Sequence, residues 1–238
     1  MIIIGPSTGW MYERGINSIS EQKKIITEIK ANALEINISF PNKEREKSLD
    51  TGDIFDSNYY RGLHTEYNPD IELNEQVSLI KKIFDTHKLD ILSIHPIKIP
   101  ERYYEEILSN NIPIAIENMD KNKSNGYQIK ELTKLLEIYP LTFVFDVQHA
   151  FEHDPSMVYA KELFDAIKEK LSHIHVSGET KEIDHALLTK ANNKEVIIDF
   201  IRKIFLIKNT PIILEGQHST TEELKQEIQL LTKELNQV

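Results

Sequence analysis

The chain has 238 residues, of which 40% are hydrophobic and 28% are charged, and its formal net charge is −10 at pH 7. This size and composition suit one large core, as in a single α/β barrel. The acidic balance argues against broad, non-specific binding to nucleic acid, and the absence of cysteine excludes disulfides and thiolate metal sites.

No Pro/Gly/Ser-rich linker or low-complexity run divides the sequence, so we expect one domain over residues 1–238. The apolar start of the chain is too short and too uncharged for a secretory signal. No apolar run approaches the length of a membrane span. These features predict a soluble, cytoplasmic protein that has no membrane partner, and no protein partner is indicated.

Strand-like and helix-like segments alternate along the whole chain. The strand-like segments are short apolar runs, and residues 33–40 also alternate polar and apolar positions. We expect strands at residues 2–5, 33–40, 62–66, 89–95, 112–117, 141–147, 171–176 and 211–215.

The segments between these strands have the signals of helices. Residues 18–21 and 219–222 are capping boxes, and Asp154 with Pro155 predicts a further helix start. We expect helices at residues 18–30, 71–87, 101–108, 128–138, 154–170 and 194–205, and a last one from residue 219. Eight strand–helix units in this length predict a single-domain (β/α)₈ TIM barrel, although residues 41–60 and 177–193 read as long loops.

Side chains that bind metals stand at or just beyond the ends of six predicted strands. The carboxylates among them alternate with large apolar neighbours, so they can face the barrel axis while those neighbours face the helices. The set is His64, His95, Glu117, Asp146, His149, His175 and Glu215.

The topology of the sheet decides whether these groups can meet. An open sheet would spread the six strand ends over about 24 Å, at roughly 4.8 Å per neighbouring strand. A closed barrel gathers them at one mouth, where barrel active sites lie. The pattern therefore favours the barrel over a doubly wound sheet, which is the alternative.

Imidazole and carboxylate ligands without thiolate suit Zn²⁺, with Mn²⁺ and Fe²⁺ as alternatives. The number of ligands exceeds what one ion needs, so we expect several ions with Glu117 as the bridge between them. Neighbouring ions would polarise a phosphate and hold both oxygens of a displacement. A single ion with Glu117 and Glu215 as acid and base would instead suit enolisation of a sugar.

Three other polar residues have weaker signals. Glu35 points inward on the second predicted strand, where it would orient water or substrate or fill the lumen. His173 shares a strand face with His175 but lies deeper, so we expect it inside the lumen. His87 lies on a predicted helix, and we expect it to be exposed to solvent.

Short motifs in this set resemble the xylose-isomerase-like barrel superfamily, and most closely its endonuclease IV branch. The sequence Asp146-Val147-Gln148-His149-Ala150-Phe151 resembles that branch's Asp-Thr-x-His-Ala-Phe signature. Four other motifs of the branch have counterparts in His95-Pro96, Glu117-Asn118, Leu214-Glu215 and His64-Thr65-Glu66-Tyr67.

The resemblance implies two or three divalent ions per chain, with Glu117, Asp146 and Glu215 as catalytic residues. It implies that His64 and His95 hold one ion, that Glu117 bridges to a second ion held by Asp146, His175 and Glu215, and that His149 and His185 hold a third. It also implies that Tyr67 contacts DNA beside an abasic site, where the phosphodiester 5′ to that site is hydrolysed. The order Asp184-His185 departs from the branch's Asp-x-His.

Two alternatives remain beside this favoured hydrolase. Sugar isomerases and epimerases of the superfamily share only Glu117, Asp146, His175 and Glu215 as a one-metal set, so the chain would act on a small sugar or sugar phosphate. The other alternative is a metal-binding barrel without catalysis. The acidic charge and the short chain favour the isomerase, whereas the His64/His95 pair favours the hydrolase.

Overall fold

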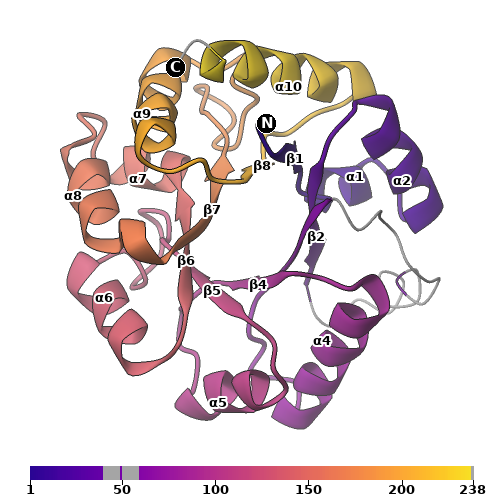
Figure 1. The fold of residues 1–238 in the computed structure, drawn as a ribbon, viewed down its shortest axis with the longest axis vertical. Helices are drawn as coiled ribbons and strands as arrows, with labels where there is room; N and C mark the ends of the chain where they lie inside the picture. Colours follow the sequence, from indigo (N-terminus) through magenta and orange to yellow (C-terminus); the bar gives the residue numbers. More distant parts are fainter. Residues whose placement is uncertain (40–48, 50–58, 237–238) are drawn as a thin grey trace.

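The computed structural model describes residues 1–39, 49 and 59–236. In these residues, eight parallel strands form a nearly closed barrel with helices around its outside (Figure 1). The predicted (β/α)₈ TIM barrel is confirmed. Most of the loop predicted at residues 41–60 lies outside the described residues, and the extent of the domain over residues 1–238 stays a prediction.

The strands follow one another around the barrel in the order β1-β8-β7-β6-β5-β4-β3-β2. From β2 to β8, each strand therefore pairs with the next one in the sequence, and β8 pairs with β1. The bounds are β1 Ile4–Pro6, β2 Ala33–Ile38, β3 Tyr60–Thr65, β4 Ile91–Ile94, β5 Ile114–Glu117, β6 Thr142–Asp146, β7 Leu171–Val176 and β8 Ile212–Leu214.

The helices cover the outer faces of the strands (Figure 1). Their bounds are α1 Gly9–Glu13, α2 Ile19–Glu28, α4 Leu73–His87, α5 Glu101–Ser109, α6 Ile129–Ile138, α7 Val147–His153, α8 Val158–Ile167, α9 Lys194–Ile207 and α10 Thr221–Leu235, with a 3₁₀ turn at Lys168–Lys170. The sequence did not predict α1 or α7. Each begins within three residues of the end of the preceding strand.

Two predicted helix starts were wrong. The helix expected from Asp154 begins at Val158. The Asp154 side chain accepts hydrogen bonds from the backbone N–H groups of Ser156 and Tyr159, and the next residue that could start the helix, Met157, has a positive φ of 61°. The last capping box lies one residue later than expected, with Thr220 as the cap.

β1 and β2 close the barrel through a short, irregular seam. The backbone N–H of Thr8 donates to the carbonyl of Glu35 over 2.8 Å, and Ser7 and Glu35 form an isolated parallel bridge. At Gly5, a Cβ atom would lie 1.6 Å from the carbonyl oxygen of Ala33. Only glycine therefore lets the two backbones approach this closely.

Most buried apolar side chains pack between the strands and the helices. His87 joins this layer: it is fully buried and its Nε2 lies 2.8 Å from the carbonyl oxygen of Leu49, so the predicted exposure was wrong. Inside the barrel, a small cluster of Ile91, Ala115 and Val144 packs with Tyr60. Among the described helices, none is both long and apolar enough to cross a membrane.

Candidate metal centre

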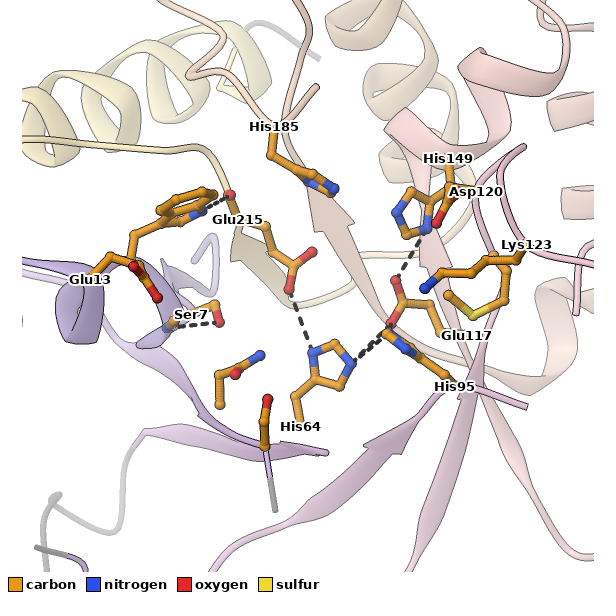
Figure 2. A pocket seen from close by; sticks show the side chains of 15 residues that line it. Ser7, Glu13, His64, His95, Glu117, Asp120, Lys123, His149, His185 and Glu215 are labelled. Atoms are coloured by element: carbon orange, nitrogen blue, oxygen red, sulfur yellow. Dashed lines mark hydrogen bonds and ion pairs between the residues drawn. The ribbon is translucent and has the colours of Figure 1, made fainter. Parts of the chain in front are cut away.

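The carboxyl ends of the strands open into a pocket of about 630 Å³ (Figure 2). Six of the predicted ligands line it: His64, His95, Glu117, His149, His185 and Glu215. Asp146 and His175 are fully buried and approach these side chains from within the barrel. The strand ends therefore converge as the sequence pattern predicted.

One ligand group joins the ends of β3, β4 and β5. The Nε2 atoms of His64 and His95 lie 3.0 Å apart. Both face Oε2 of Glu117, at 3.4 Å from His64 and 3.6 Å from His95 (Figure 2). These three side chains could hold one metal ion between them.

A second ligand group contains Glu117, Asp146, His175 and Glu215. Nδ1 of His175 lies 3.4 Å from Oε1 of Glu117 and 3.4 Å from Oε2 of Glu215. Glu117 therefore offers one oxygen to each group. Glu117 could therefore bridge ions held by the two groups, and this bridging role stays a prediction.

The buried atoms of this cluster fit a divalent cation. Among the described residues, both oxygens of Glu117, Oδ2 of Asp146 and Nδ1 of His175 are buried without a hydrogen-bond partner. Each such atom costs about 1–3 kcal/mol, and more if it is charged. A set of imidazoles and carboxylates whose lone pairs are not used in hydrogen bonds suits Zn²⁺, Mn²⁺ or Fe²⁺.

The charges of the cluster are strongly coupled. Burial would raise the pKa of Glu117, but His175, His95 and His64 outweigh it and hold that pKa well below its usual value. Burial would lower the pKa of His175, but Glu215, Glu35 and Glu117 raise it well above its usual value. A proton on His175 thus balances the carboxylates around it, and a bound cation would replace that proton.

Comparisons with known proteins agree with this architecture. No protein-family model matches the chain. An uncharacterized protein of Methanocaldococcus jannaschii is 25% identical over 178 residues, which cover 58% of this chain and 64% of that protein. The match therefore spans less than two thirds of the relative's length.

Solved structures match the whole chain. A D-tagatose 3-epimerase-like protein superposes with a TM-score of 0.68 and 19% identity, covering 100% of this chain and 98% of the other. A xylose isomerase domain containing protein of Salmonella typhimurium LT2 gives 0.67 and 13%, with 98% and 97% covered. SacUVDE gives 0.60 and 17%, with both chains fully covered at 100%. The chain has the xylose-isomerase-like barrel fold.

In this xylose-isomerase-like barrel, Asn118 locks the ends of β5 and β6 together. Its side chain donates to the carbonyl of Asp146 and accepts from the N–H of Asp146, both over 2.9 Å. Oδ1 of Asp146 accepts from the N–H of His149 over 2.7 Å and so caps α7. One carboxylate therefore ends a strand, starts a helix and leaves Oδ2 for a cation.

His149 and His185 lie next to each other in the lining of the pocket, edge to face, with ring centroids 5.5 Å apart (Figure 2). Nδ1 of His149 lies 2.8 Å from the carbonyl oxygen of Asn118, and Nδ1 of His185 lies 3.1 Å from Oγ of Ser177. Nε2 of each ring would then be the atom left to bind an ion. Asp184 is exposed, and in the described part of the chain neither histidine belongs to a group of three ligands, so the third ion stays a prediction.

Tyr67 lies apart from the lining of the pocket. Its half-buried ring packs edge-on against Tyr103, with centroids 5.1 Å apart. Its contact with DNA stays a prediction.

Sequence reasoning did not predict the contacts that three residues make with the candidate ligands. Glu35 is fully buried and contacts both His64 and His175. Glu66 lies 2.7 Å from Nδ1 of His95, and its position two residues after His64, on the same strand face, was the available signal. Trp10 donates its indole N–H to the carbonyl of Glu215 over 2.6 Å from α1, a helix without a clear sequence signal.

Proposed function

We propose that the chain is a divalent-metal-dependent phosphodiester hydrolase of the endonuclease IV type, and that it cleaves DNA at abasic sites. The observation that carries this proposal is the position of Glu117. Its two oxygens face two different ligand groups, one with His64 and His95 and one with His175 and Glu215. A one-metal enzyme needs only one of these groups.

Bound ions would supply an activated water and offset the charge of the leaving oxygen. The side chains have distinct tasks around that chemistry. Glu117 and Asp146 are at most 1% exposed and serve as ligands, whereas the Glu215 side chain is 13% exposed and is best placed to accept a proton from water. Lys123 lines the same pocket and supplies a positive charge for a phosphate.

A single-metal sugar isomerase or epimerase is the second candidate. The group of Glu117, Asp146, His175 and Glu215 could hold one ion by itself, with two carboxylates left to move protons. The pocket of about 630 Å³ is ample for a small sugar or sugar phosphate. The D-tagatose 3-epimerase-like structure has the same fold.

Metal content and nicking of an abasic duplex test the hydrolase. Protein loaded with Zn²⁺ should contain at least two ions per chain, measured by plasma mass spectrometry, and should cut a duplex that has one abasic site. Glu117→Gln should lose both the cleavage and at least one ion. Chelation should stop the cleavage.

Histidine variants separate the two candidates. His64→Asn should lose one ion and the nicking activity if the chain is the hydrolase, whereas a one-metal epimerase would keep its ion. His153→Asn is the matched control, because the His153 side chain is not part of the lining of the metal pocket and contacts the carbonyl of Met119 and the ring of Tyr127. Fully metallated protein that leaves the duplex intact contradicts the hydrolase.

A further inference from the structure

A line of buried polar side chains continues below the metal centre, where barrels usually have branched apolar residues. Glu35 of β2 lies at its middle. Oε2 of Glu35 accepts from the hydroxyl of Ser93 over 2.6 Å and lies 3.4 Å from Nε2 of His173. Nδ1 of His173 in turn lies 2.8 Å from the hydroxyl of Tyr60. Side chains from β4 and β7, which do not pair with β2, therefore hold one edge of this carboxylate in place.

The other oxygen of Glu35 faces two of the candidate histidine ligands, on the side of each ring that points away from Glu117. Oε1 lies 3.0 Å from Nε2 of His175 and 3.6 Å from Nδ1 of His64. The opposite nitrogens of the same two rings face Glu117, at 3.4 Å in each case. Each ring thus has one nitrogen toward Glu35 and one toward the bridging carboxylate.

The neighbouring strand leaves room for this arrangement. Gly62 of β3 is the direct partner of Glu35 in the strand register. A Cβ atom at Gly62 would lie 2.9 Å from Oε2 of Glu35. Any larger residue would therefore push the carboxylate away from Ser93.

We propose that Glu35 is a positioning residue that orients His175, and with it His64, toward the metal ions. Nε2 of His175 and Oε1 of Glu35 lie 3.0 Å apart, so a proton on Nε2 would lie beside this carboxylate, and the lone pair of Nδ1 would be left for an ion held by Glu117 and Glu215. A carboxylate behind an imidazole fixes the tautomer and the ring orientation of a metal ligand and raises its basicity. The inference rests on the proposed metal centre.

Metal affinity and the tautomer of His175 test this role. Glu35→Gln should keep the number of bound Zn²⁺ ions but bind them about 10- to 100-fold more weakly in competition with a chelator. In ¹⁵N spectra of histidine-labelled, Zn²⁺-loaded protein, the Nε2 signal of His175 should shift. Ser93→Ala, which removes the hydroxyl that donates to Glu35, should weaken binding in the same direction by a smaller factor.

Glu227→Gln is the matched control. Glu227 is also a buried glutamate, but it accepts hydrogen bonds from the backbone of Leu188 and Thr189. This variant should lower the melting temperature without changing Zn²⁺ affinity.

Three results would contradict the inference in different ways. Unchanged affinity and an unchanged His175 spectrum in both Glu35→Gln and Ser93→Ala would overturn it alone. Loss of one whole ion in Glu35→Gln, with the others bound normally, would show a direct ligand instead of a positioning residue. Wild-type protein that binds no ion would overturn the proposed function and this inference together.

Discussion

His95 shows how a single side chain couples metal binding to protons. Burial alone would lower the pKa of His95, but its contacts with Glu117 and Glu66 outweigh burial and raise that pKa to about 10. Contact with His95 in turn lowers the pKa of Glu66 to about 2. At neutral pH the imidazole is therefore protonated, while its partner is ionised.

A metal ion must displace this proton to bind His95. Zn²⁺ binding at pH 7.5 should release protons, and the affinity should rise with pH until it approaches the pKa of about 10. Titration calorimetry in two buffers of different ionisation enthalpy measures the number released. Glu66→Gln keeps the ligand but removes its anionic partner, so fewer protons should be released. Equal release in both proteins would argue against the Glu66 contact.

At the scale of residues, strand alternation predicted much of the site. It placed the ligands of β3 to β8 at one mouth because parallel strands end together and side chains alternate. The same alternation turned Glu35 inward but could not tell which groups it would meet from β3, β4 and β7. His87 was misassigned although it continues the apolar stripe of Ile80 and Phe84 at helical spacing. The role of His185 came from family resemblance, because its loop has no periodic pattern.

At the scale of elements, the seam between β1 and β2 determines whether the barrel closes. Gly5→Ala should cost at least about 3 kcal/mol, because the added methyl group would overlap the backbone of Ala33. Urea unfolding followed by circular dichroism measures this loss. Gly9→Ala is the control: its Cβ would meet ordinary contacts at 3.6 Å or more, and the change should stay below about 1 kcal/mol. Equal stability of Gly5→Ala and wild type would refute this account of the seam.

Element boundaries show where sequence patterns stop being informative. The strands and most helices were predictable because each has an apolar face or an apolar core run. α7 was missed because Asp146 ends a strand and caps a helix without an intervening turn. The start at Asp154 was misplaced because an Asp-Pro pair also suits a turn, which is the form that it takes here.

At the scale of the whole molecule, the candidate metal ligands come from six strands of the barrel, β3 to β8. Ions bound there should stabilise the entire fold, because they bind the native state only. At 100 times the dissociation constant this amounts to about 2.7 kcal/mol per ion. For a chain of this size that is roughly 5–10 °C in melting temperature.

Removal of metal should therefore lower the melting temperature reversibly. Scanning calorimetry of Zn²⁺-loaded protein, of chelated protein and of chelated protein with Zn²⁺ restored measures the effect. Because Glu117→Gln should lose at least one ion, chelation should lower its melting temperature by less than it lowers that of the wild type. If chelation leaves the melting temperature of the wild type unchanged, no bound ion stabilises the barrel.

The contact between Trp10 and the carbonyl of Glu215 has a practical consequence. Trp10 is the single tryptophan of the chain. It lines the pocket, and its indole N–H donates to the backbone carbonyl of Glu215, a candidate metal ligand. Its fluorescence on selective excitation therefore comes from one place, the rim of the pocket. The protein carries its own optical probe for whatever enters there, without any attached dye.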